Sequence, residues 1–224
     1  MAFQEYERIA RSAGKLASHT SANIEAIEEN AATREVAALY EYFRTHFGRP
    51  DVPGILKCFA THPALLRHMM DLSESLIFTE GHLTRKHKEM IATLVSTQNS
   101  CPYCADSHGY FLRVHGGSAE VLDAIRKCKL DSPVLTDSER ALLGFARKVN
   151  MSSHEIDRRD VVLLIRSGWM EPQIAETVHV VALFSTFNRV ANAFGLSSQG
   201  LLSLFDSESD HTADRNSKVE RNSQ

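Results

Sequence analysis

Four residues of this chain have side chains and spacing that suit the joint transfer of electrons and protons. Cys101 and Cys104 are three positions apart, Glu89 lies twelve positions before the first cysteine, and His108 lies four after the second. Two cysteines at that spacing could form a local disulfide or share a metal ion. The thiolate is the nucleophilic form of cysteine, and a nearby carboxylate and imidazole could carry the proton that separates it from the thiol. The set therefore predicts redox chemistry.

Two helices joined by a tight turn must bring these residues together. Thr84 has the side chain of a helix N-cap, and the helix that follows extends to about Asn99. A second helix begins at Cys101 and ends before two consecutive glycines. If the two helices run antiparallel, Glu89 and His108 lie about ten positions from the turn on either side. At 1.5 Å of rise per residue they reach the same height, so the spacing predicts a Glu89–His108 pair.

On the second helix Cys101, Cys104 and His108 share one face, because they stand at positions i, i+3 and i+7. A helix N-terminus and an adjacent imidazolium both lower the pKa of a thiol. Two other interpretations stay open at this point. The cysteines could form half of a zinc site with His108 or His115, and Glu89 could be an ordinary solvated helix residue.

The whole chain has the pattern of an all-α protein: a single domain of about eight helices, with Cys-X-X-Cys at the start of a helix in an antiparallel hairpin. Residues 19–205 are the expected domain, residues 1–18 a mobile segment, and residues 206–224, which have almost no apolar side chains, a disordered tail. The segment Val161–Ile165 could be a strand, but the flanking Asp157, Asp160 and Gly168 favour a helix. Other expected helices lie between Ile24 and Gly48, after Pro63, after Ser118, after Thr136 and from Pro172 to Phe194.

Composition excludes several classes of partner. With 43% hydrophobic residues, a net charge of −3 and a pI near 6.4, the chain should not bind nucleic acid or an anionic membrane. It shows neither a signal peptide nor an apolar run that could span a bilayer, so we expect a cytoplasmic protein. In a reducing compartment a cysteine pair is more often catalytic or metal-binding than a permanent disulfide. Cys58 and Cys128 lie alone among apolar residues and are predicted to be buried core thiols.

The pattern Glu-X11-Cys-X2-Cys-X3-His, formed here by Glu89, Cys101, Cys104 and His108, resembles the signature of the alkyl hydroperoxidase D-like branch of the carboxymuconolactone decarboxylase superfamily. The Cys-Pro-Tyr-Cys segment and residues 187–195, Phe-Asn-Arg-Val-Ala-Asn-Ala-Phe-Gly, are similar to its peroxidase-related subgroup. The resemblance covers roughly residues 33–204. The decarboxylase branch lacks the cysteine pair, which disfavours decarboxylation here.

The resemblance implies an all-α fold and reduction of a hydroperoxide by the dithiol, without a cofactor or a bound metal. Cys104 would attack the peroxide, Cys101 would resolve the sulfenic acid into a disulfide, and Glu89 with His108 would relay the proton. The reductant would be a dithiol, such as a lipoyl protein or a thioredoxin-like donor, and the protein would assemble as a homotrimer or hexamer. One departure is Tyr103, where some members have a second histidine between the cysteines.

Three functions remain as alternatives: a dithiol peroxidase, a redox-sensing or disulfide-exchange protein with little turnover, and a metal-binding helical module. The linked glutamate and histidine favour the first, since neither a sensor nor a zinc site needs a proton relay. Asn188 and Arg189 lie in the last long helix. Arg189 could pair with an acidic residue near the site or at a subunit interface, or it could belong to the wall of the active site.

Overall fold

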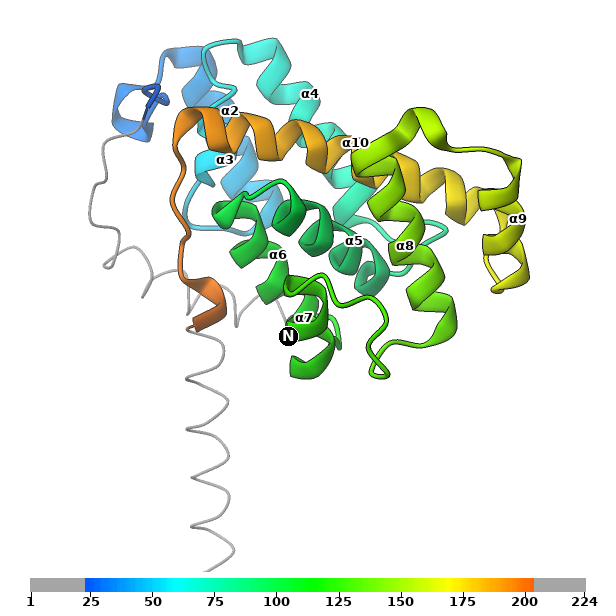
Figure 1. Cartoon of the computed structure of the whole chain (residues 1–224). Helices are drawn as coiled ribbons and strands as arrows, with labels where there is room; N and C mark the ends of the chain where they lie inside the picture. The colour runs from blue at the N-terminus through cyan, green and yellow to red at the C-terminus, as the bar shows by residue number, and fades with distance from the viewer. Residues whose placement is uncertain (1–22, 204–224) are drawn as a thin grey trace, which may run out of the picture.

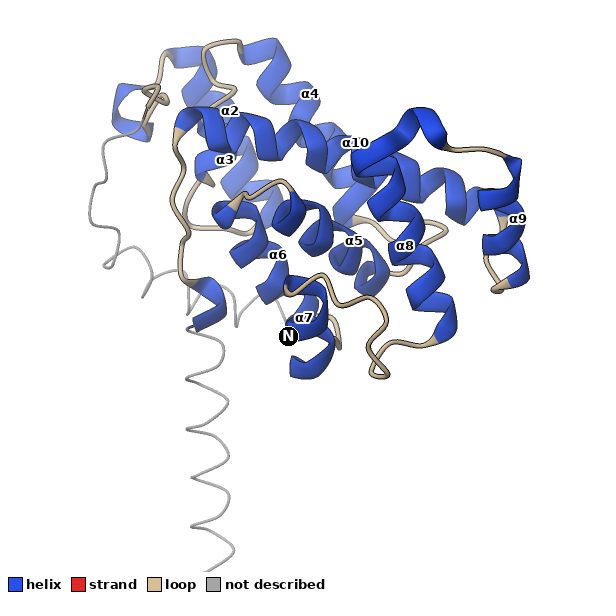
Figure 2. Ribbon diagram, viewed as in Figure 1, coloured by secondary structure: helices blue, strands red, loops and turns tan. Residues whose placement is uncertain are grey.

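The computed structural model describes residues 23–203, and within that range every regular element is a helix and none is a strand (Figure 2). The predicted all-α class is therefore confirmed. The predicted mobile segment 1–18 and disordered tail 206–224 lie outside the described residues. The α-helices are α2 (Arg34–Phe47), α3 (Gly54–Lys57), α4 (Pro63–Ser73), α5 (Arg85–Gln98), α6 (Pro102–Val114), α7 (Ala119–Arg126), α8 (Asp137–Ser152), α9 (Arg158–Arg166) and α10 (Glu171–Phe194). Three short elements, η1 (Glu29–Ala31), η2 (Glu74–Phe78) and η3 (Ser153–Glu155), complete the set.

Local capping signals set most helix ends. The side chains of Thr84, Ser118 and Thr136 each accept a hydrogen bond from a backbone N–H in the first turn of the following helix. Gly48 and Gly195 adopt the left-handed conformation after α2 and α10, with φ of 61° and 77°. The ambiguous segment around Val161 is helical, as predicted, and forms part of α9.

Helix α5 lies at the centre of the fold, and its residues from Lys88 to Ser96 are all buried. It packs against α6, α8 and α10, and Figure 1 shows α10 crossing over the α5–α6 pair. The turn between α5 and α6 is very short, with Ser100 at a φ of 50°. The chain therefore reverses direction within three residues, and α6 packs along α5 as an antiparallel neighbour.

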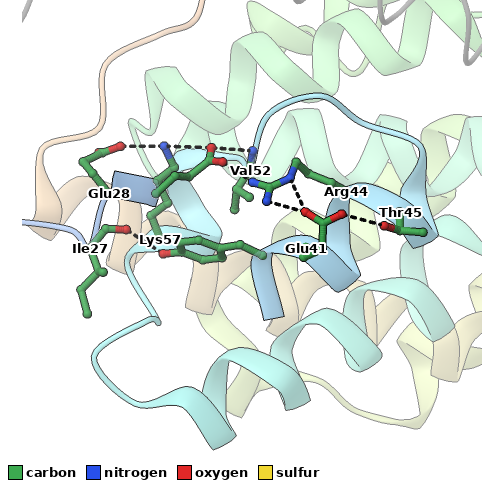
Figure 3. Close-up of polar contacts among 9 residues, drawn as sticks. Ile27, Glu28, Glu41, Arg44, Thr45, Val52 and Lys57 are labelled. Atoms are coloured by element: carbon green, nitrogen blue, oxygen red, sulfur yellow. Dashed lines mark hydrogen bonds and ion pairs between the residues drawn. The ribbon is translucent and has the colours of Figure 1, made fainter. Parts of the chain in front are cut away.

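The predicted helix between Ile24 and Gly48 is wrong in its first half, because α2 begins only at Arg34. Thr33 is the N-cap, and its hydroxyl accepts from the N–H of Val36 at 3.4 Å. The residues before it form an extended segment with one 3-10 turn, and polar contacts hold this segment in place (Figure 3). Lys57 Nζ lies 2.7 Å from Glu28 Oε2, Arg44 pairs with Glu29, and the Tyr40 hydroxyl donates to the Ile27 carbonyl at 2.7 Å.

A buried ion pair fixes the loop that leads into α5. Lys88 is fully buried, and its Nζ lies 2.7 Å from Glu176 Oε1 on α10 and donates to the Thr79 carbonyl at 2.8 Å. The second oxygen of Glu176 accepts from the N–H of Leu83 at 2.7 Å. Every polar group of the pair is thus engaged, and both ends of the loop are tied to helices that carry the site described below.

The two isolated cysteines differ from one another. Cys58 is a buried free thiol at the end of α3, and burial raises its pKa to about 12, as a core position implies. Cys128 is only half-buried and lies beyond α7 in a left-handed conformation, with a φ of 52°. The prediction that both are fully buried is therefore wrong for Cys128. No helix between residues 23 and 203 has both the length and the apolarity needed to cross a membrane.

Candidate active site

Glu89 of α5 and His108 of α6 lie side by side. Glu89 Oε2 is 2.6 Å from His108 Nδ1, at the height that the spacing predicts. Glu89 has no exposed surface, and burial alone would raise its pKa; the neighbouring His108 and Arg85 outweigh burial and lower it. The carboxyl group is therefore held as an anion, ready to orient and stabilise an imidazole that carries a proton.

The second oxygen of Glu89 is occupied by a residue that the sequence analysis did not single out. Arg85 lies one turn earlier on α5, and its Nε and Nη2 both lie 2.6 Å from Glu89 Oε1. The spacing of four residues between opposite charges on one helix is a signal that could have identified it. The result is a continuous line of three side chains, Arg85–Glu89–His108.

Cys101 and Cys104 lie at the N-terminus of α6, both free and both almost completely buried. Cys101 is the N-cap residue. A hydrogen bond from Cys104 lowers the pKa of Cys101 to about 7, with further help from Asn188 and backbone N–H groups and against the effect of burial. The same shared hydrogen bond, together with burial, raises the pKa of Cys104. When the pair loses one proton, Cys104 therefore keeps its own proton and the negative charge lies on Cys101.

Asn188 of α10 is fully buried beside the two sulfur atoms and favours the thiolate form of both. Its Nδ2 donates to Ser96 Oγ at 3.0 Å, and its Oδ1 accepts from Asn99 Nδ2 at 3.0 Å. These two contacts fix the amide, so that its remaining N–H can face the dithiol. Sequence analysis placed Asn188 in a family-like segment without a role. Arg189 is exposed and donates to the Ser185 carbonyl at 2.7 Å, and within residues 23–203 it forms no ion pair with an acidic side chain.

An apolar pocket opens beside the dithiol. It offers about 90 Å³ of space, and its wall contains Cys104 and His108 but not Cys101. The ring of Phe184 lies edge-on to the His108 imidazole, with centroids 4.5 Å apart. The Tyr103 hydroxyl accepts from the N–H of Ile55 at 3.4 Å. The rest of the wall is mainly aromatic and aliphatic: Phe43, Phe47, Pro53, Ile55, Leu56, Met70, Ile77, Phe78, Phe111, Phe187 and Leu201, with Arg49, Ser73, Tyr103, Ser107 and Gln199 as its polar members.

The zinc interpretation finds no ligand set. Among residues 23–203 no group of three or more histidine, cysteine, aspartate or glutamate side chains converges as a metal site would require. His108 is engaged with Glu89, and His115 lies two turns further along at the C-cap of α6. What the arrangement can do is hold a thiolate, deliver a second thiol to it, and carry a proton through a carboxylate–imidazole pair.

Comparison with known proteins finds one matching family model and several similar solved structures. The model of the carboxymuconolactone decarboxylase family matches residues 63–148. The structure is similar to an alkylhydroperoxidase AhpD core protein, an uncharacterized peroxidase-related protein from Ralstonia eutropha JMP134, at 26% identity and a TM-score of 0.72, covering 83% of this chain and 96% of that one. A peroxidase-related protein from Silicibacter sp. TM1040 is 27% identical with a TM-score of 0.64, over 77% of this chain and 86% of its own. The uncharacterized protein YdfG of Bacillus subtilis (strain 168) is 24% identical over 136 residues, which are 59% of this chain and 88% of YdfG.

Residues 63–148 therefore match the carboxymuconolactone decarboxylase family model, and the structure is similar to AhpD-like, peroxidase-related proteins. The resemblance drawn from the sequence is confirmed at this level. The matched region contains α5 and α6, and with them both cysteines, Glu89 and His108.

Proposed function

We propose that this protein is a thiol-dependent hydroperoxide reductase that uses Cys101 and Cys104 as a redox dithiol. The observation that carries the proposal is the 2.6 Å contact between Glu89 and His108 beside the two thiols. A disulfide-exchange or sensor protein needs a reactive thiol, but it does not need a buried proton relay. The peroxidase-related neighbours support the same reaction class.

The proposed reaction reduces one hydroperoxide to an alcohol and water and oxidises the two cysteines to a disulfide. The Cys104 thiolate attacks the distal oxygen of a hydroperoxide ROOH, the O–O bond breaks, and Cys104 becomes a sulfenic acid. The leaving alkoxide takes a proton from His108 and departs as ROH, while Glu89 stabilises the imidazole as it gives up and regains that proton. Cys101 then attacks the sulfenic sulfur, and the disulfide forms with release of water. A dithiol reductant returns both cysteines to thiols and is itself oxidised.

Two observations bear differently on the roles of the cysteines. The pKa of Cys101 is the lower one, whereas Cys104 is the cysteine that reaches the pocket. Both are consistent with Cys104 as the attacking group if Cys101 first accepts its proton. The shared hydrogen bond converts Cys101–S⁻···H–S–Cys104 into Cys101–S–H···⁻S–Cys104 by moving one proton, which leaves the thiolate in the pocket wall and a thiol behind it.

The pocket supports a small organic hydroperoxide as the substrate. Its wall is mostly aromatic and aliphatic, so it favours an apolar substituent over the small polar molecule hydrogen peroxide. Because both sulfur atoms are almost completely buried, we expect a flexible dithiol arm, such as that of a lipoyl protein, as the reductant. A thioredoxin-like donor is the alternative. We also propose a cytoplasmic homo-oligomer, a trimer or hexamer, that binds neither nucleic acid nor membrane.

Consumption of an organic hydroperoxide with dihydrolipoamide as reductant tests the proposal. Wild-type protein should turn over, and Cys104→Ser should lose both turnover and sulfenic-acid trapping. Cys101→Ser should lose turnover but leave a trappable sulfenic acid on Cys104. Cys58→Ser is the matched control, because that thiol lies in the core, and it should behave as wild type.

Two results would redirect the assignment. A sulfenic acid on Cys101 would reverse the two roles. Stoichiometric oxidation without turnover would favour a redox sensor if Glu89→Gln and His108→Gln both react at the wild-type rate. In the proposed reductase each of these two variants should react about 10²–10⁴-fold more slowly.

A further inference from the structure

Arg85 is the first member of the row of contacting side chains Arg85–Glu89–His108. Its guanidinium holds Glu89 Oε1 through both Nε and Nη2 at 2.6 Å, while Glu89 Oε2 faces His108 at the same distance. The two oxygens of one carboxylate are thus divided between a permanent cation and a titratable ring. Any change in the charge or position of Arg85 must reach His108 through Glu89.

Two aromatic side chains fix the guanidinium in place. Arg85 Cζ lies 5.0 Å from the centroid of the Phe78 ring and 5.7 Å from that of Phe111. Both rings belong to the wall of the pocket, and Phe78 is the last residue of the π-helical element η2. Cation–π contact and the two-nitrogen contact with Glu89 both depend on a planar guanidinium. The Arg85 side chain is only 12% exposed, so its charge is weakly screened.

Arg85 supplies Glu89 with a counter-charge that does not depend on the protonation of His108. His108 contacts the same carboxylate but is a titratable ring, whereas the Arg85 guanidinium is always charged. With Arg85 present, Glu89 stays ionised whether or not His108 carries a proton. The relay can therefore release the His108 proton to a leaving group without Glu89 becoming protonated in its place.

We propose that Arg85 is a positioning residue of the relay, which keeps the buried Glu89 ionised and its free oxygen aimed at His108. The inference rests on the proposed function, since it assigns a task within that proton transfer. Among the described residues Arg85 contacts the relay at Glu89 and has no contact with either sulfur atom.

The other charged or titratable groups near this line are few. From α6 they are Cys101, Cys104 and His115, and Glu80 lies in the loop before α5 and acts on His115. From α10 the group against His108 is the uncharged Phe184 ring. Lys88 of α5 is neutralised by Glu176, and Arg49 is one of the residues that line the pocket. Removing Arg85 therefore removes the one permanent cation in direct contact with Glu89 among the described residues.

The test is the pH dependence of the reactivity of the dithiol, measured for Arg85→Gln and Arg85→Lys. Loss of the cation raises the pKa of Glu89, so the acid limb of the rate profile should move to higher pH. We expect a shift of about one unit for Arg85→Gln. Arg85→Lys keeps the charge without the planar fork and should shift less than half as far. Arg140→Gln removes a partly exposed arginine paired with Asp137 and should leave the profile unchanged.

Both peroxide turnover and the rate of modification by a small thiol reagent are recorded, so that failure of the two proposals can be told apart. Absence of turnover in the wild type would contradict the reductase, while the thiol-reagent profile would still decide the role of Arg85. An Arg85→Gln profile that superimposes on wild type, or moves to lower pH, would overturn the inference even if the overall rate fell. If Arg85→Gln does not fold, an unshifted Arg85→Lys profile overturns it equally.

Discussion

Asn188 offers the sharpest test of how the fold produces a reactive thiol. The amide is fully buried, it is fixed by Ser96 and Asn99, and it favours the ionised form of Cys101. In Asn188→Leu the side chain keeps a similar volume but can no longer donate a hydrogen bond. We expect the Cys101 thiolate to lose stability relative to the thiol, so the pKa of this cysteine should rise.

The magnitude follows from the strength of a hydrogen bond to a charged group, about 1.5–3 kcal/mol. Since about 1.4 kcal/mol corresponds to one pKa unit, the pKa of Cys101 should rise by about one to two units. The pKa of Cys101 in the wild type is about 7. We expect a rise at the lower end of that range, because Cys104 supplies the larger hydrogen bond and remains in place. At pH 7 the thiolate fraction should then fall from about one half to about one tenth.

The assay is the thiolate absorbance near 240 nm as a function of pH, with Cys101→Ser as the blank. Asn192→Leu is the matched control: it lies one turn further along α10, and its amide donates to the Asn99 carbonyl at 3.1 Å. Asn188→Leu also removes the donor to Ser96 Oγ and one of the two acceptors of Asn99 Nδ2, so thermal unfolding must show that the protein folds. Asn188→Asp is the second variant, which keeps the acceptor for Asn99 and should raise the pKa further.

A titration curve for Asn188→Leu that matches wild type would refute the reasoning. An equal shift in Asn192→Leu would refute it as well, because the effect would then come from a general loosening of α10. The same measurement has a kinetic counterpart: the rate of peroxide reduction at pH 7 should fall about fivefold, and most of the loss should be recovered near pH 9.

Four further outcomes are expected. Lys88→Met should destabilise the fold by about 3–5 kcal/mol in urea unfolding, and adding Glu176→Leu should restore most of it, because both members of a buried pair are then gone. Below neutral pH the wild type should lose the stability of this pair as pH falls through the folded-state pKa of Glu176, which is lowered in the fold; the double variant should not. Gly81→Ala should cost about 1–3 kcal/mol, since its Cβ would collide with Glu176. Alkylation followed by mass spectrometry after one equivalent of peroxide should show a Cys101–Cys104 disulfide, with Cys58 still reduced.

Much of the fold could be predicted because its helix ends are set locally. Thr84, Thr136 and Gly195 each interact with backbone groups within a few residues, so the sequence around them carries the information. The start of α2 could not be predicted in this way. Ile24 and Ile27 continue the apolar spacing of the helix, but ion pairs with distant residues such as Lys57 hold their segment in another conformation. Periodicity cannot represent a contact of that range.

The same distinction between local signals and long-range contacts applies to the residues of the candidate site. Glu89 and His108 could be paired by counting, because both lie on straight helices joined by a turn too short to alter their register. Arg85 carried a readable signal in its distance of four residues from Glu89. Asn188 carried none, since α10 meets the dithiol only after the chain has passed through four other helices. Its role depends on tertiary packing that no local spacing encodes.

The same distinction explains why spacing and electrostatics favour different cysteines. Sequence spacing describes positions along α6 only, and there Cys104 is the nearer neighbour of His108. The pKa also reflects the N-terminal position of Cys101, the Cys104 hydrogen bond and the amide brought in by α10. The two preferences are compatible because one proton shared between the sulfur atoms can move without any heavy atom moving. When a substrate enters the pocket, Cys104 gives its proton to the Cys101 thiolate and becomes the attacking group. The dithiol should therefore react as a unit, and either single-cysteine variant should lose turnover.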